Sequence, residues 1–289
     1  MENTISDRSS AFCLPAINNG LALANPNGKP WRTTTAVQKA YLETYGMSGF
    51  DTKLLGKYLK GMVTQDSAEL NRWFADNGWP MSISIPLGGL GIGSIFDLLV
   101  DWQVPGRKKE GGICITQGND RVFCEGGEMS PSEGLTAYTL HDYAHPMFEL
   151  STQQDGWKVF LVKADGPCNP FTLPKIAHNL LNQARSTFVF TKLEFPFVRL
   201  EADVDIRWMV GMGIEGGFHI DEAVKKVKLT LDDKGARAQS AVAYTMRGMT
   251  SGVYTLNTPF YVIFWHEDLS YPAFVALSAS DSWTRVCHR

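Results

Sequence analysis

Three side chains in the middle of the chain have residue types and a spacing that suit metal binding or proton transfer. His141 and His145 lie four residues apart with Asp142 between them, in the segment TLHDYAHP. On a helix this spacing brings two imidazoles to one face, where they can share a metal ion. Here the neighbouring residues are typical of strands and Pro146 closes the segment, so the spacing does not bring the rings together. We therefore predict surface histidines on a loop and no metal. His141, Asp142 and His145 are catalytic candidates only if the protein is an enzyme.

Other motifs of common chemistry are incomplete or absent. Residues 88–94 (GGLGIGS) are rich in glycine, like a phosphate-binding loop, but no Lys-Ser or Lys-Thr pair follows them and the next residues are typical of a strand. A glycine-rich turn is the commoner use of such a run. The sequence contains no G-x-S-x-G and no H-E-x-x-H motif. These observations predict no cofactor and favour a protein that is not an enzyme, while leaving a repurposed enzyme open.

The strongest signal lies near the C-terminus, where small side chains join strand-like segments. Residues 224–231 are typical of a strand, and Gly235 then supplies a flexible hinge. Residues 236–243 are mostly small and alternate with a period of two, which suits an exposed loop and also a strand between two others. Residues 246–252 (MRGMTSG) are typical of an exposed loop, in which Arg247 attracts proteases. The pattern predicts a protease-sensitive loop that is able to enter a sheet.

Several segments around this loop resemble the serpins. Residues 233–238 (DKGARA) are similar to the acidic-x-Gly-Thr-x-Ala hinge of that family, and residues 257–260 (NTPF) to its Asn-x-Pro-Phe strand start. Residues 193–218 resemble the block of the family that ends in Gly-Ile and Phe. A weaker resemblance covers residues 68–77 and 9–34. The likeness thus extends over most of the chain and is strongest in its C-terminal third.

The resemblance implies a single α+β domain over residues 1–289, with N-terminal helices, mixed and mostly antiparallel sheets, and an exposed loop near the C-terminus. The chain is dozens of residues shorter than the family norm, so the large sheet of the family, sheet A, is expected to be reduced. In the hinge, Asp233 replaces Glu, Ala236 replaces Thr, and Arg237 stands where shorter or acidic residues are common.

The function implied by the resemblance is suicide inhibition of a serine or cysteine protease. A serpin inserts its cleaved loop into the large sheet as a new strand and distorts the captured protease. The reactive bond follows sixteen residues after Asp233. The residues assigned in this way are the hinge, Asp233, Gly235, Ala236 and Ala238, and the bond Met249-Thr250, with Arg247-Gly248 as the alternative.

The alternative function is a non-inhibitory serpin scaffold that binds a small hydrophobic ligand or a partner, or catalyses a reaction, in an aromatic-lined pocket. The 8 Trp residues of the chain are an excess that core packing or such a pocket would explain. A fold alone does not decide between these functions.

The elements that must position the loop follow a simple order, with helices first and strands after. Apolar residues at helical spacing predict helices over residues 33–45, 51–62 and 66–74, and a later helix over 173–183. A short helix is expected around 204–211. Runs rich in β-branched and aromatic residues predict strands over 82–85, 95–102, 111–117, 121–126, 135–140, 147–151, 157–163, 188–193, 195–201, 224–231, 259–265 and 273–277. The last two strands are expected to pair antiparallel in a central sheet.

Composition and charge indicate which classes of binding partner and which cellular compartment to expect. The net charge of −3 gives no support to nucleic-acid binding. Residues 83–100 are nearly uncharged, but Pro86, several glycines and Asp97 interrupt any membrane helix, so no membrane association is expected. The N-terminus does not resemble a signal peptide. The cysteines form no C-x-x-C pair, which predicts free thiols and a cytoplasmic location. They are Cys13, Cys114, Cys124, Cys168 and Cys287.

Overall fold

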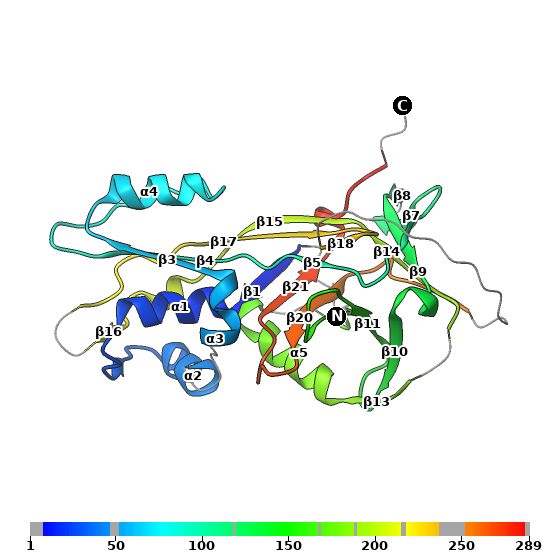
Figure 1. The fold of residues 1–289 in the computed structure, drawn as a ribbon, viewed down its shortest axis with the longest axis horizontal. Helices are drawn as coiled ribbons and strands as arrows, with labels where there is room; N and C mark the ends of the chain where they lie inside the picture. The colour runs from blue at the N-terminus through cyan, green and yellow to red at the C-terminus, as the bar shows by residue number, and fades with distance from the viewer. Residues whose placement is uncertain are drawn as a thin grey trace. The chain divides into compact units, whose positions relative to one another are not determined.

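The chain divides into two compact units, each assembled from separate stretches of sequence. Figure 1 labels the helices and strands that make up these units. The first unit comprises Met1–Phe12, Leu99–Ala202 and Val227–Arg289, and the second comprises Cys13–Leu98 and Asp203–Lys226. The computed structural model describes residues 8–46, 52–117, 120–166, 169–187, 190–214, 218–236 and 252–286. Strands β15 (Val198–Val204) and β17 (Lys225–Leu231) pair with each other.

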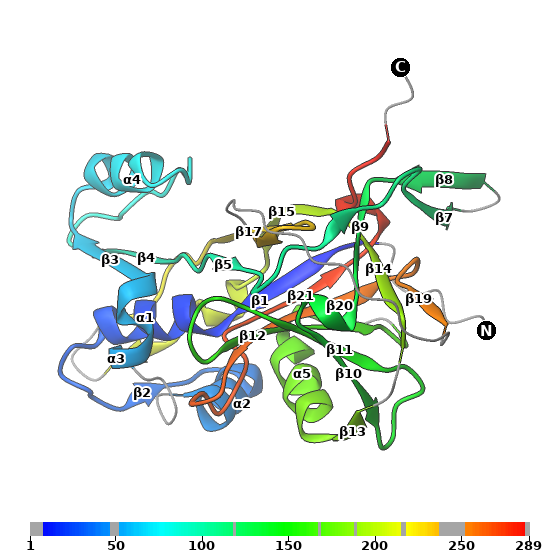
Figure 2. The same cartoon turned by 45° about the vertical axis from the view of Figure 1, so that its right-hand side comes forward.

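A seven-stranded sheet is the largest in the first unit, with the order β1-β21-β20-β12-β11-β10-β13 (Figure 2). Its strands are β1 (Ser10–Cys13), β10 (Leu135–Leu140), β11 (Met147–Ser151), β12 (Trp157–Lys163), β13 (Ala184–Thr187), β20 (Phe260–His266) and β21 (Phe274–Ser278). The pairs from β10 through β21 are antiparallel. The predicted antiparallel pairing of the last two strands is confirmed, with Phe260 opposite Ser278 and Phe264 opposite Phe274.

Strands β20 and β21 of this sheet are buried on both faces. Strand β20 has the sequence FYVIFWH, and all its residues except Trp265 are buried. Helix α5 (Leu173–Asn182) packs against β21 and buries Leu173, Ala177 and Leu180. A continuous hydrophobic run is the pattern expected for a strand that has no solvated face.

Smaller β elements complete the first unit. A four-stranded sheet has the order β19-β14-β9-β6, and β7 pairs with β8, as does β5 with β18. Their bounds are β5 (Val100–Asp101), β6 (Arg107–Lys108), β7 (Ile113–Gln117), β8 (Asp120–Cys124), β9 (Gly126–Met129), β14 (Lys192–Pro196), β18 (Gly235–Ala236) and β19 (Val253–Thr255). The 3-10 turns are η2 (Pro131–Glu133), η3 (Pro170–Thr172) and η5 (Ser280–Ser282).

The second unit holds most of the helices. They are α1 (Leu14–Ala24), α2 (Ala36–Tyr45), α3 (Thr52–Leu55) and α4 (Ser67–Asp76), with the 3-10 turns η1 (Gly56–Tyr58) and η4 (Arg207–Met209). Its strands are β2 (Trp31–Arg32), β3 (Leu59–Thr64), β4 (Gly91–Phe96) and β16 (Gly213–Ile214). A capping box between Thr35 and Gln38 starts α2, as the polar residues before the apolar pattern suggest. Helix α4 packs on β3 and β4 through a cluster of Leu70, Phe74 and Ile95.

Three predictions for the first hundred residues were wrong. Residues 51–62 were predicted to be helical, but only Thr52–Leu55 are α-helical, and β3 begins at Leu59 because it pairs with β4 along its whole length. Tertiary pairing here overrides the helical spacing of the apolar residues. Residues 82–85 were predicted to be a strand but have no ladder partner; the side chain of Asn71 binds the backbone of Ile83 instead. The strand predicted over 95–102 is interrupted between Phe96 and Val100.

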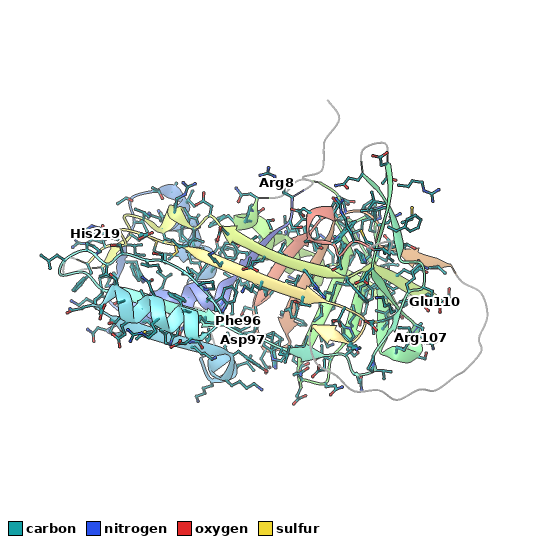
Figure 3. All side chains as sticks on the ribbon, turned by 90° about the horizontal axis from the view of Figure 1, so that it is seen from above. Arg8, Phe96, Asp97, Arg107, Glu110 and His219 are labelled. Carbon is teal, nitrogen blue, oxygen red and sulfur yellow. The ribbon has the colours of Figure 1, made fainter. Side chains whose placement is uncertain are left out.

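The strand nearest the hinge lies in a small sheet. Strand β17 pairs with β15, and the two lie side by side in Figure 3. Strand β18, which follows β17 in the chain, pairs with β5 in a separate two-stranded sheet. The β-structure next to the predicted loop is therefore divided into two-stranded parts.

Candidate functional site

The N-terminal end of the predicted loop is a tight turn held by its own side chain. Asp232 Oδ1 accepts hydrogen bonds from the backbone N–H groups of Lys234 (2.9 Å) and Gly235 (3.2 Å). The backbone N–H of Asp232 donates to the carbonyl of Gly235 at 3.1 Å. An Asp side chain that binds the backbone two residues on is a common way to form a turn. The chain leaving β17 is thereby reversed toward β5.

Gly235 occupies a position that admits no side chain. Its φ is +153°, and a Cβ atom there would lie 2.7 Å from the carbonyl oxygen of Val100. This close approach lets Gly235 pair with Asp101, and Ala236 with Val100, in an antiparallel ladder. Glycine is the residue that combines such a conformation with close backbone contact. The first residues of the predicted hinge therefore lie as a short strand.

The carbonyl groups of the turn are anchored to the segment after β5. The indole Nε1 of the fully buried Trp102 donates to the carbonyl of Asp232 at 3.0 Å, and its backbone N–H donates to that of Lys234 at 3.2 Å. The backbone N–H of Gly106 donates to the carbonyl of Asp233 at 2.6 Å. Burial raises the pKa of the Asp233 carboxyl above its usual value. Each of the three consecutive carbonyls thus has a partner.

The C-terminal end of the predicted loop enters β19. This strand pairs in parallel with β14, where Thr255 lies opposite Glu194. Thr255 Oγ1 donates to Glu194 Oε2 at 3.0 Å, and the backbone N–H of Leu256 donates to the Glu194 carbonyl at 2.8 Å. Lys109 Nζ lies 2.6 Å from Glu194 Oε1. A buried carboxylate therefore holds the strand that follows the loop.

The centre of the predicted loop lies outside the described residues. This part comprises residues 237–251 and includes the predicted hinge residue Ala238 and both candidate reactive bonds, Met249-Thr250 and Arg247-Gly248. The described hinge residues are Asp233, Gly235 and the backbone of Ala236. The site that is described consists of the two ends that hold the loop.

The candidate histidines lie in the connection between β10 and β11, which is a loop as predicted. His141 Nδ1 pairs with Asp142 Oδ1, and both side chains are exposed. His145 instead has partners from distant parts of the chain: Asp165 Oδ1 is 3.1 Å from Nε2, and the Tyr254 hydroxyl is 3.4 Å from Nδ1. The structure therefore gives the two histidines different carboxylate partners.

Sequence reasoning missed Asp165 and Tyr254, which are far from His145 in the chain and carry no motif. Burial, with a smaller contribution from the Asp165 charge, raises the pKa of Tyr254, so this hydroxyl keeps its proton and is a poor nucleophile. Within the described ranges, no group of three His, Cys, Asp or Glu residues could hold a metal ion. The arrangement around His145 is best described as an anchor for β19, the strand that contains Tyr254.

Three cysteines are described, and all are free: Cys13, Cys114 and Cys124. Burial raises the pKa of the Cys13 and Cys124 thiols, which keeps them protonated and unreactive. Cys168 and Cys287 lie outside the described residues. No helix in the described parts of the chain is long and apolar enough to cross a membrane.

No family model and no curated protein matches the sequence. Solved structures do match the fold over nearly the whole chain. Human thyroxine-binding globulin complexed with thyroxine has a TM-score of 0.65 at 10% identity, covering 96% of this chain and 93% of the other. Human glycosylated kallistatin has a TM-score of 0.60 at 13% identity, covering 95% and 92%. Mouse protein-Z dependent protease inhibitor has a TM-score of 0.60 at 10% identity, covering 94% and 91%.

The chain has the serpin fold. The predicted α+β class, with helices and mostly antiparallel sheets, is confirmed. The TM-scores establish the serpin fold, and at sequence identities of 10–13% the comparison establishes nothing more specific. These serpin-fold structures include a protein named as a protease inhibitor and one named for binding thyroxine.

Proposed function

We propose that this chain is a serpin-like inhibitor of a serine or cysteine protease that acts through a reactive-centre loop between β18 and β19. The observation that carries the proposal is the pairing of Gly235 and Ala236 with β5. The hinge has already turned toward β5 and formed the first pairs of a strand with it. A cleaved loop that continued this ladder would satisfy further backbone groups without a new turn.

The composition of the following residues supports continued insertion. Residues 236–243 are mostly small, contain no proline and alternate with the period of a strand. In this proposal the attacking protease forms an acyl-enzyme with the carbonyl of Met249 and releases the amine of Thr250. Insertion of the loop then distorts the protease before water can hydrolyse the ester or thioester. Arg247-Gly248 is the alternative bond.

The test is covalent trapping. The protein is incubated with limiting chymotrypsin, which suits Met249, with trypsin, which suits Arg247, and with papain as a cysteine protease. The proposal predicts a complex that survives SDS with at least one of them, and a released peptide that begins at Thr250 or Gly248. The same protease with its nucleophile replaced is the control and should give no covalent complex. Nicked chain without complex, for all of the protease classes, would contradict the proposal.

The second candidate function is a non-inhibitory scaffold that binds a small hydrophobic ligand. Its support is the fold similarity to thyroxine-binding globulin, whose solved structure contains thyroxine. This candidate predicts that an aromatic hydrophobic compound such as thyroxine raises the melting temperature in a saturable way, while proteases give only nicked chain. We include a reducing, cytoplasmic location in the proposal; the free thiols of Cys13, Cys114 and Cys124 support it.

A further inference from the structure

One short segment of the first unit contacts the hinge turn directly and is connected to β19 through Glu194 of β14. This segment, residues 106–109, includes β6 and follows the anchor residue Trp102. At its start, the Gly106 N–H donates to the Asp233 carbonyl in the hinge turn at 2.6 Å. At its end, Lys109 Nζ lies 2.6 Å from the Glu194 carboxylate that also binds Thr255. Figure 3 labels Arg107 and Glu110, which flank Lys108 and Lys109 in the chain.

The contact with the hinge depends on close backbone approach. A Cβ atom at Gly106 would lie 2.6 Å from Met129 Cγ and 2.8 Å from the Glu128 carbonyl oxygen. There is no room for a side chain, so the glycine lets the backbone lie against β9 and reach Asp233. The segment therefore contacts the hinge directly through its main chain.

The connection to β19 is a charge-assisted clamp through Glu194 of β14. The side chains of Lys109 and Glu194 are 26% and 11% exposed, so solvent screens this pair less than an exposed pair. Glu194 uses one oxygen for Lys109 and the other for the hydroxyl of Thr255. Hydrogen bonds to ionised groups are stronger than neutral ones. The clamp therefore stabilises β19 in addition to its three-residue pairing with β14.

The segment between these two contacts is held firmly. Arg107 pairs with Glu128 and Lys108 with Gly127 in the ladder with β9, and the Lys109 N–H donates to the Gly126 carbonyl at 2.8 Å. These backbone bonds resist a displacement of the segment at either end. The two ends of the loop are thus connected through a few residues of regular structure.

We propose that residues 106–109 couple the two ends of the reactive-centre loop, with Lys109 and Glu194 as positioning residues for β19. The inference rests on the proposed function, because that function gives these ends a loop to hold. The coupling is reciprocal: loosening β19 loosens the hinge turn, and displacing the hinge loosens β19. In this proposal the element with two states is the pairing of Gly235 and Ala236 with β5, which is either formed or broken.

The test is amide hydrogen exchange of the intact full-length protein, read at both ends. Thr255→Val removes the hydroxyl that binds Glu194, and Lys109→Met removes the cation. Either variant should speed exchange by about tenfold at Leu256 and also at Gly235, since a hydrogen bond to a charged group is worth about that factor. Lys108→Met is the matched control. Lys108 lies next to Lys109 in the chain, and its Nζ is 2.8 Å from Glu125 Oε1. The variant removes this ion pair and leaves the bond between Glu194 and Thr255 in place.

The outcomes separate this inference from the proposed function. Faster exchange at both ends in Thr255→Val and Lys109→Met, but not in Lys108→Met, supports the coupling. Faster exchange at Leu256 alone, or an equal effect in Lys108→Met, overturns it. The exchange experiment needs no protease, so a failure to trap any protease would contradict the proposed function without changing this result. If trapping occurs, the two coupled variants should give a lower ratio of complex to nicked chain than Lys108→Met.

Discussion

Lys225 offers a test of the second unit because its amine is buried at the start of β17. The side chain is 8% exposed, and Nζ donates to the backbone carbonyl of Cys13 at 3.2 Å. Burial lowers the pKa of Lys225 from 10.5 to about 8. A tenfold change in proton affinity is about 1.4 kcal/mol, so this change costs the folded state about 3 kcal/mol at neutral pH.

The sign of the pH dependence follows from the number of protons that the folded and unfolded states bind at Lys225. Between pH 8 and 10.5 the unfolded chain binds a proton at Lys225 that the folded protein has released, so the free energy of unfolding rises with pH in this window. Below pH 8 both states bind the proton, and the full cost of burying the charge remains. Lys225→Met removes this cost together with the hydrogen bond to the Cys13 carbonyl, and such a bond is worth about 1 kcal/mol. We therefore expect the variant to be more stable by about 2 kcal/mol at neutral pH and to lose this advantage as pH rises through the window.

The assay is urea unfolding of both proteins at four pH values from neutral to about 10, followed by Trp fluorescence. Lys228→Met, on the same strand but with a side chain 41% exposed, is the matched control and should show no such pH dependence. Repeating the comparison in a Cys13→Ala background removes the neighbouring thiol, which is also titratable. A stability difference that does not vary with pH, or that varies equally in Lys228→Met, would refute the reasoning.

Three further predictions concern the fold, the hinge and the thiols. Gln38→Leu should lower the free energy of unfolding by about 3 kcal/mol. The reason is that the buried amide binds the backbone of Thr34 and the carbonyls of Trp208 and Val210. A loss below about 1 kcal/mol in urea unfolding would contradict this prediction. Gly235→Ala should reduce the yield of SDS-stable complex without preventing cleavage, because the added Cβ would collide with the backbone of β5. An unchanged ratio of complex to nicked chain on gels would show that the close approach of Gly235 to Val100 is unimportant. Thiol titration under denaturing, non-reducing conditions should find all 5 cysteines free, and recovery of one or three would indicate maturation in an oxidising compartment.

The central strands were predictable because their pattern is local. The predicted ranges 135–140, 147–151 and 157–163 coincide with β10, β11 and β12. Each is a short run with apolar or aromatic residues bounded by turn residues. Strand β10 alternates between buried and more exposed residues, while most residues of β11 and β12 are buried. Strand β3 was missed since its partner β4 lies far along the chain and its own residues also fit a helix.

At the ends of the loop, the sequence predicted a residue's role only where the residue type itself indicates that role. Gly235 stood out as a hinge glycine, and the structure shows a conformation there that excludes other residues. Glu194 and Lys109 carry no such signal; they meet across 85 residues, and Glu194 meets Thr255 across 61. Contacts between ordinary charged residues on separate strands depend on sheet order and register, which a single sequence does not specify.

The most direct test of the proposed function is the melting temperature of the protein before and after cleavage in residues 237–251. If the cleaved loop extends β18 along β5, each new ladder hydrogen bond contributes about 1 kcal/mol, and the melting temperature should rise by about 10 °C or more.

Two variants make the comparison specific to insertion. Ala238→Arg overfills an inward position of the new strand and should abolish the rise, while Gln239→Arg, on the opposite face, should retain it. A cleaved protein that melts no higher than the intact one would contradict loop insertion, and with it inhibition by trapping.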